Sequence, residues 1–314
     1  MAMIHQALKK LARFGRPQKI SQTRNEKPAS VQDWLHLIQD AKAAGTLTAE
    51  TTALVDNHDL KPGAHAVTHF SKEIESKGLD AFRLYAQDPR AHLEDAVHEI
   101  VKWKTVAQCG HSHDVSKGYF IDAEPYMAVQ WNQIIYPLIK DINMDVTLDL
   151  ACGHGRNTEY LRQHAKVLHL VDVNASCIDA CRERFGDNKN GTTFFYHVTD
   201  GNSLRMIADE TIGFVYSWDS MVHFDKLVVR DYVKEIARVL KSGGTAFLHH
   251  SNYGETAPDS DWAHNVGTRS DMSGALMRDY AAENNLKIVK QAIQGRKEGW
   301  GQDGLDCVSL LQKS

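Results

Sequence analysis

A short turn that contains two glycines is the first place in this sequence where residue types could support chemistry. The run Thr147–Asn157 reads as a hydrophobic strand that ends at Asp149, followed by a small-residue turn with Gly153 and Gly155. Glycine lets the main chain come close to a ligand that a β-carbon would keep away. A dinucleotide-binding loop needs a third glycine, and Thr158 stands in its place. The turn therefore predicts a small-molecule site, with an NAD-dependent oxidoreductase as a disfavoured alternative.

Two more acids follow the next predicted strands. Asp172 ends the strand at 167–171, 23 residues after Asp149, and Asp200 follows the third strand, directly before Gly201. A carboxylate at the end of the second strand can accept hydrogen bonds from both hydroxyls of a ribose. Asp200 is placed to contact an adenine edge. One such aspartate alone could be a helix cap or a turn residue, but three at successive strand ends together favour a nucleoside-containing ligand.

Titratable side chains also follow the fourth and fifth predicted strands. Asp219 stands at the carboxyl end of the fourth strand, and His223 follows one helical turn later on the same side. His249 and His250 end the fifth strand, where neighbouring side chains point to opposite faces, so we expect one of them to face the site. A hydroxyl acceptor must lose a proton to a base with a suitable pKa. We expect His223 or His250 to be that base and Asp219 to orient it, although a structural histidine would also fit.

A metal site is the alternative use of these side chains. Asp219 and the histidines could hold a divalent ion that polarises an acceptor oxygen, but they come from separate strands and no closely spaced motif joins them. The five cysteines are Cys109, Cys152, Cys177, Cys181 and Cys307. Only one pair among them is four residues apart, which does not make a zinc site. We therefore expect no metal and five reduced thiols, as in a cytosolic protein.

The elements that must position these residues alternate between strands and helices from about residue 116. The predicted strands are Val146–Leu150, Val167–Val171, Phe194–His197, Phe214–Ser217, Thr245–His250, Leu286–Gln291 and Cys307–Leu311. Amphipathic helical stretches lie between most of them, such as Tyr232–Leu240 before the predicted turn Lys241–Gly244. This alternation favours an α/β fold with a Rossmann-like, doubly wound, seven-stranded sheet. Ligands of such sheets bind beyond the carboxyl ends of the strands, where the strand order reverses.

The glycine turn and the acids together resemble a known family. The run D149-x-A-x-G153-x-G155, with Asp172 and Asp200 at the next two strand ends, resembles the class I S-adenosylmethionine-dependent methyltransferases over about residues 116–314. The resemblance implies that S-adenosylmethionine is the cofactor and that Asp149 and the loop backbone hold its methionine end. Asp172 would then bind the ribose, and Asp200 would lie near the adenine. The implied cofactor-binding residues are Asp149, Ala151, Gly153, Gly155, Asp172, Asp200, Gly201 and Trp218. Ala151 stands where many members have glycine.

Further strings narrow this resemblance to a subfamily. They are EPYMAVQW (124–131), SWDSMVHF (217–224), HHSNY (249–253), GTRSDMS (267–273) and LDC (305–307). Together they look like methyltransferases of bacterial polysaccharide and O-antigen biosynthesis, which implies O-methylation of a sugar hydroxyl. A methyltransferase for a small natural product, or a non-catalytic module that binds S-adenosylmethionine, remains an alternative.

The same resemblance implies a set of acceptor-binding residues. Tyr126 and Trp131 would flank the cofactor or the acceptor, and His249 and Asn252 would contact the acceptor. Arg269 could pair bidentately with a carboxylate or phosphate of an acidic sugar. Ordinary amphipathic packing would explain the two aromatic residues equally well. Arg269 could equally be a solvent-exposed loop residue without a binding role.

Composition and charge divide the 314-residue chain into three parts. The net charge of −4 and pI near 6.5 exclude a chain-wide nucleic-acid footprint. Residues 1–30 nevertheless carry a net charge of +6, which leaves −10 on the rest. Ile4, Leu8, Leu11 and Phe14 recur in this arm at helical spacing, which suits either a helix on an anionic membrane surface or a solvated tail. Residues from Gly15 to Ser30 read as a linker.

Residues 31–115 are predicted to be helical, as a cap or an oligomerisation element. Asp88-Pro89 is a typical helix start ahead of an apolar face, and Lys61–Gly63 marks a turn. No apolar run approaches the roughly 20 residues of a membrane span, and no secretory signal is evident. We therefore expect a cytoplasmic enzyme, whose arm would also suit a lipid-linked acceptor at the cytoplasmic face of the inner membrane.

Overall fold

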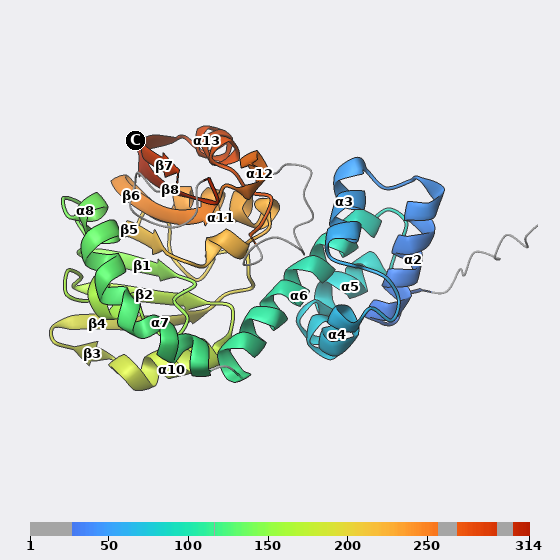
Figure 1. Cartoon of the computed structure of the whole chain (residues 1–314), viewed down its shortest axis with the longest axis horizontal. Coiled ribbons are helices and arrows are strands. Elements are labelled where there is room, and N and C mark those ends of the chain that lie inside the picture. Colours follow the sequence, from blue (N-terminus) through green and yellow to red (C-terminus); the bar gives the residue numbers. More distant parts are fainter. Residues whose placement is uncertain (1–26, 116, 257–268, 294–303) are drawn as a thin grey trace, which may run out of the picture.

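The computed structural model describes residues 27–115, 117–256, 269–293 and 304–314 (Figure 1). Residues 1–26 of the basic arm, with the predicted helix that contains Ile4 and Phe14, lie outside these residues. The first described helices are α2 (Val31–Ala44), α3 (Ala49–Asn57), α4 (His65–Lys77), α5 (Leu79–Tyr85) and α6 (Leu93–Val115). The structure thus has a helical region ahead of the sheet.

Helix α2 shows why these helices form. The Ser30 hydroxyl accepts a hydrogen bond from the Asp33 backbone at 3.2 Å, and the Asp33 carboxylate accepts one from the Ser30 backbone at 3.1 Å. Trp34, Leu35 and Ile38 form one buried face, which packs with side chains of α6. Helix α6 begins at Leu93, later than the predicted start, because Asp88-Pro89 lies in the preceding turn.

A broken helix links this region to the sheet. Helix α7 (Lys117–Gln130) runs into a π-helical turn, η1 (Trp131–Ile135), and then into α8 (Tyr136–Ile139). Met127 and the side chains of Trp131 and Ile139 are buried against one face of the sheet. Burial of each such side chain contributes roughly 1.5–3 kcal/mol.

The sheet confirms the predicted α/β fold and has eight strands rather than seven. The strands are β1 (Val146–Leu150), β2 (Val167–Asp172), β3 (Asn188–Lys189), β4 (Thr192–Val198), β5 (Ile212–Ser217), β6 (Leu240–Ser251), β7 (Leu286–Ile293) and β8 (Asp306–Lys313). Their order is β3-β4-β2-β1-β5-β6-β8-β7. Strands β4, β2, β1, β5 and β6 are parallel, and β8 is antiparallel to both β6 and β7. The order reverses between β1 and β5, where a ligand crevice is expected.

Two local features of the sheet differ from the sequence prediction. The short strand β3 pairs with the start of β4 and was not predicted. The predicted turn Lys241–Gly244 belongs to β6, because Leu240 already pairs with Ile212 of β5. Gly243 has the positive φ of +76° that a turn residue would have, and regular pairing with β5 resumes at Thr245, so this stretch is an irregularity within the strand.

Helices cover both faces of the sheet. They are α9 (Thr158–Leu161), α10 (Ala175–Phe185), α11 (Lys226–Val239), α12 (Tyr253–Thr256) and α13 (Gly274–Glu283), with a 3-10 turn η2 (Met221–His223). Side chains of α10 join those of η1 in one core cluster, and side chains of α11 and α13 join the other. In α11 the buried residues Val229, Tyr232, Val233 and Ile236 recur at helical spacing.

The helical region lies at the carboxyl edge of the sheet. The arrowheads of β1 and β2 point toward it in Figure 1. Val173, the residue after β2, packs against the core of the helical region. The Lys226 ammonium at the start of α11 lies 3.2 Å from Glu50 of α3 and 3.0 Å from Asp271. The helices therefore stand over the edge at which the ligand site is expected.

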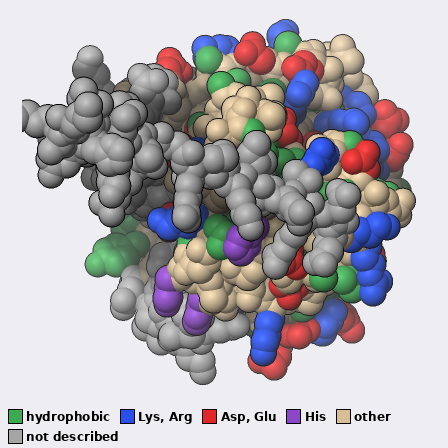
Figure 2. All heavy atoms as spheres, turned by 90° about the vertical axis from the view of Figure 1, so that its right-hand side faces the viewer, with side chains coloured by type: hydrophobic (Ala, Val, Ile, Leu, Met, Phe, Trp, Pro, Cys, Tyr) green, Lys and Arg blue, Asp and Glu red, His purple; other side chains and the backbone are tan. Residues whose placement is uncertain are grey.

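The outer surface of the helical region is mixed in charge. Figure 2 shows basic and acidic side chains interspersed over the described part of this end of the molecule. Pairs such as Lys61–Asp59 and Lys77–Glu73 contribute to this pattern. Among the described helices, none has the length and apolar character needed to span a membrane.

Candidate active site

The glycine loop after β1 adopts a backbone that few residue types allow. Ala151, Gly153 and Gly155 have φ values of +58°, +53° and +78°. A β-carbon on Gly155 would lie 2.4 Å from a ring carbon of Phe185, so glycine is required there. Ala151 adopts the left-handed conformation that glycine would favour, at a cost of roughly 1–2 kcal/mol. The loop therefore presents main chain at the carboxyl end of β1.

Hydrogen bonds fasten this loop to neighbouring strands. The Tyr216 hydroxyl of β5 donates to the Asn157 side chain at 2.9 Å, and the Ser220 hydroxyl donates to the Ala151 carbonyl at 3.2 Å. Tyr216 lies in β5, the strand next to β1, and Ser220 lies shortly after it. These two bonds therefore hold the loop at the point where the strand order reverses.

Asp149 is a buried acid beneath the loop. Its side chain accepts a 2.6 Å hydrogen bond from the Thr158 hydroxyl. Burial raises the pKa of Asp149 to about 7, although the bond from Thr158 acts in the opposite direction. A cation that binds beside this carboxyl would favour its ionised form. The site thus suits a positively charged ligand such as a sulfonium or an ammonium.

Asp172, at the end of β2, holds the glycine loop in place. One carboxylate oxygen accepts the Gly153 N–H at 3.0 Å, and the other accepts the Asn174 N–H at 2.9 Å. Each oxygen has a second lone pair, which is what recognition of two ribose hydroxyls would use. The structure therefore brings Asp149, Asp172 and the glycine loop together at adjacent strand ends.

The Asp200 side chain bonds mainly to residues of its own turn. Its carboxylate accepts hydrogen bonds from the Ser203 backbone at 2.9 Å and the Ser203 hydroxyl at 3.0 Å, and it pairs with Arg205. Partial burial by itself would raise the pKa of Asp200, but these bonds outweigh it, and the pKa is lowered. Gly201 follows with φ +94°, next to Val173 and the aliphatic part of Lys102 from α6. Asp200 therefore shapes the turn at the end of β4, and any contact with adenine remains a prediction.

Asp219 lies at the end of β5 and pairs with an arginine that sequence reasoning missed. Its carboxylate accepts a 3.1 Å hydrogen bond from Arg156, the residue after Gly155. Arg156 directly follows the glycine turn, a position that could have drawn attention to it. His223 ends the 3-10 turn η2 and is partly exposed. Both candidate catalytic residues therefore lie in the segment after β5, and the Asp219 side chain reaches the glycine loop through Arg156.

His250 is placed unfavourably for a catalytic base. The side chain is fully buried, with Nδ1 2.8 Å from the Ser251 carbonyl and Nε2 2.8 Å from the Ser309 hydroxyl. Burial lowers the pKa of His250 to about 4. Since both ring nitrogens are used within the sheet, this placement argues against the predicted role, and we now interpret His250 as a core residue.

Three predicted acceptor residues make contacts within the fold, and a fourth, Tyr126, lies on the surface. Trp131 is 4% exposed and stacks on Tyr160, whereas Tyr126 is 68% exposed on α7. The Asn252 side chain is buried and bonds to the backbone of Gly274 and Gly304. Arg269 makes a bidentate pair with Asp306 at 2.9 and 2.7 Å. These contacts favour structural roles over direct acceptor binding.

His249 and Trp218 stack at the ends of β6 and β5. Their ring centroids are 4.2 Å apart, and the Asp219 N–H donates to His249 Nδ1 at 3.1 Å. His249 Nε2 lies 3.4 Å from the carboxylate of Asp306, a second residue that sequence reasoning did not single out. The predicted cofactor residue Trp218 and the predicted acceptor residue His249 are therefore in contact with each other.

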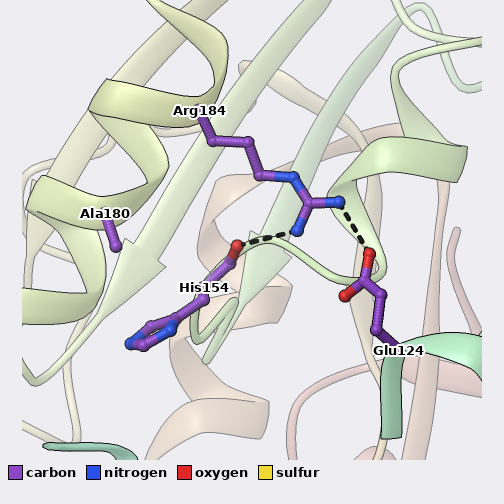
Figure 3. A pocket seen from close by; sticks show the side chains of 4 residues that line it. All are labelled: Glu124, His154, Ala180 and Arg184. Carbon is purple, nitrogen blue, oxygen red and sulfur yellow. Dashed lines mark hydrogen bonds and ion pairs between the residues drawn. The ribbon is translucent and has the colours of Figure 1, made fainter. Parts of the chain in front are cut away.

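A pocket of about 370 Å³ lies on the other side of the glycine loop, between α7 and α10 (Figure 3). Glu124, His154, Ala180 and Arg184 line it. Arg184 donates to the His154 carbonyl at 3.3 Å and to the Glu124 carboxylate at 2.7 Å. These bonds tie the loop to both helices.

The described cysteines and acids do not form a metal centre. Cys152, Cys177, Cys181 and Cys307 are buried, and Cys109 lies in the stretch whose side chains are not described. Within the described residues, no group of three or more metal-ligating side chains gathers.

Comparison with known proteins identifies the domain that carries this loop. Residues 147–244 match the family model described as a methyltransferase domain. This segment is a methyltransferase domain. The matched residues include the glycine loop, Asp149, Asp172 and the turn after β5, so the chain is a methyltransferase and S-adenosylmethionine is its cofactor.

Solved structures with a similar fold include three S-adenosylmethionine-related proteins. An S-adenosylmethionine-dependent methyltransferase from Clostridium acetobutylicum is 16% identical, with a TM-score of 0.47, 63% of this chain covered and 100% of that chain. One from Mesorhizobium loti is 13% identical, with a TM-score of 0.46 and coverage of 57% and 97%. Geranyl diphosphate C-methyltransferase from Streptomyces coelicolor is 13% identical, with a TM-score of 0.47 and coverage of 61% and 84%. No curated protein sequence matches the chain.

Proposed function

We propose that this methyltransferase transfers the methyl group of S-adenosylmethionine to a sugar hydroxyl in bacterial glycan biosynthesis. The proposal rests on Asp219 and His223, which follow β5. A hydroxyl acceptor needs a base to remove its proton, whereas a stronger nucleophile does not. The resemblance of strings 124–131 and 217–224 to glycan methyltransferases supports the sugar class.

The proposed chemistry is a direct displacement at the methyl group. When bound, the cofactor supplies an electrophilic methyl on a sulfonium. Asp172 would hold the ribose, and the glycine loop backbone would hold the methionine end. His223 takes the proton of the acceptor hydroxyl as its oxygen attacks, and Asp219 with Arg156 borders the acceptor. Alignment of the two reacting atoms then accounts for much of the rate.

The test is methyl transfer from isotopically labelled S-adenosylmethionine to a panel of monosaccharides, nucleotide sugars and bacterial glycans. We expect label in an alkali-stable ether on a sugar, with turnover lowered roughly 10²-fold or more in His223→Gln. His36→Gln, an exposed histidine on α2, is the matched control and should keep wild-type turnover. Label found only on amine, thiol or carbon acceptors would overturn the proposal, as would full activity of His223→Gln.

A further inference from the structure

The turn after β5 contains a backbone conformation that its residue type does not favour. Asp219 has φ +62°, in the left-handed region where residues other than glycine are uncommon. Its carboxylate pairs with Arg156 of the glycine loop at 3.1 Å. Such a conformation persists only where the surroundings hold it, so the contacts of the Asp219 backbone decide where the carboxylate lies.

His249 provides one of these contacts. The Asp219 N–H donates to His249 Nδ1 at 3.1 Å, and the ring stacks on Trp218, the residue before the turn. A ring nitrogen that accepts a hydrogen bond carries no proton. In the neutral ring the proton must therefore be on Nε2.

Asp306 lies where it can hold that proton in place. Its carboxylate is fully buried and lies 3.4 Å from His249 Nε2, and Arg269 donates to both of its oxygens. Burial opposes ionisation, but the two bonds from Arg269 and the neighbouring His249 ring outweigh it and lower the pKa of Asp306 to about 2. Antiparallel pairing of β6 with β8 sets Asp306 opposite Ser251, two residues beyond His249. The sheet itself thus places the carboxylate beside the ring.

We propose that His249 and Asp306 are positioning residues for methyl transfer. Asp306 fixes the tautomer of His249, and His249 holds the left-handed turn that directs the Asp219 carboxylate toward Arg156 and the acceptor side. Neither residue needs to touch the acceptor. The proposal rests on the acceptor site after β5 that was proposed above, and it replaces the predicted contact between His249 and the sugar.

Two substitutions of His249 separate its contacts. His249→Phe keeps a ring to stack on Trp218 but removes the acceptor for the Asp219 N–H. His249→Asn places an amide oxygen near the position of Nδ1 and gives up the ring. We expect kcat to fall about 10- to 100-fold in the Phe variant and to stay within about threefold in the Asn variant. Equal losses in both variants would overturn the proposal, because they would indicate a packing role alone.

A double-mutant cycle tests whether His249 acts through Asp219. We expect Asp219→Asn to lower kcat and His249→Phe to cause little further loss in that background, because the two side chains serve one function. Fully additive losses would overturn the proposal. Affinity for S-adenosylmethionine, measured by calorimetry without acceptor, should stay within about threefold of wild type in every variant.

The tautomer can be observed without any acceptor, which separates this proposal from the proposed function. In protein labelled with 15N-histidine, we expect one ring with an unprotonated Nδ1 and a protonated Nε2 whose signals disappear in His249→Asn. Asp306→Asn should change the signals of that ring. A protonated Nδ1 in the wild-type enzyme would overturn the proposal even if sugar methylation is confirmed.

Discussion

At the scale of single residues, the proposed role of Asp149 predicts that cofactor binding depends on pH. Burial raises its pKa to about 7, so at pH 6 the carboxyl is mostly neutral, and at pH 8 it is mostly ionised. A cationic cofactor binds the ionised form better. We expect affinity for S-adenosylmethionine to rise by up to about tenfold from pH 6 to pH 8, measured by calorimetry. Asp149→Asn should remove most of this dependence, and an unchanged profile in that variant would contradict the assignment.

The same shift has the opposite consequence for the ligand-free protein. Between about pH 4 and 7 the folded state binds more protons at Asp149 than the unfolded chain does, so this group makes the protein less stable as pH rises. Asp306, with a pKa lowered to about 2, contributes stability that is present above about pH 4 and is lost as pH falls toward 2.

Gly155 shows how closely the loop is packed. Gly155→Ala combines a positive φ with a β-carbon 2.4 Å from the ring of Phe185. Gly45→Ala is a matched control, because Gly45 has φ +68° but no atom within 4 Å of the added carbon. We expect the control to lower the free energy of unfolding by about 1 kcal/mol and Gly155→Ala by about 2–4 kcal/mol, with loss of cofactor binding. Denaturant titration of both variants measures this, and equal losses would contradict the close packing.

At the scale of elements, Lys226 joins the helical region to the methyltransferase domain. Its ammonium lies between Glu50 of α3 and Asp271, with a quarter of the side chain exposed. We expect Lys226→Gln to weaken the docking of α3 by about 1 kcal/mol, seen as faster hydrogen exchange in α3 with little change in β1. Lys61→Gln, at an exposed pair with Asp59, is the control. Unchanged exchange in α3 would show that apolar contacts alone hold the two parts together.

At the scale of the whole molecule, charge is divided between the arm and the rest of the chain. Residues 1–30 carry +6 against −10 elsewhere, and the arm lies almost wholly outside the described residues. We expect deletion of residues 1–30 to reduce binding to vesicles that contain anionic lipid, with a steep dependence on salt. Binding to neutral vesicles is the control. Equal binding of the full-length and shortened proteins would remove the membrane hypothesis.

The position of the helical region is a second property of the whole molecule. Its core receives Val173 from the end of β2, so the helices lie over the edge where we expect the ligand to bind. We interpret residues 31–115 as a cap on that edge, and the predicted alternative of an oligomerisation element is still a prediction.

Much of the fold could be predicted from local patterns. Each predicted strand overlaps an observed one, because continuous apolar runs such as Phe214–Ser217 are typical of strands buried on both faces. The glycine loop and Asp172 could also be predicted. The loop needs residues that tolerate a positive φ, and glycine is the residue type that does so most readily. The two-residue strand β3 was too short to leave a pattern.

Only the tertiary structure decided the roles of the side chains around that loop. His249 and His250 are neighbours in sequence, yet one contacts the Asp219 turn and the other is enclosed between strands, because alternate residues of a strand face opposite sides. Asp306 reaches His249 only through the pairing of β6 with β8. The sequence by itself determined the strands, the loop and the cofactor acids, since these depend on local spacing. Contacts between distant segments depend on sheet order and register, and only the folded chain supplies those.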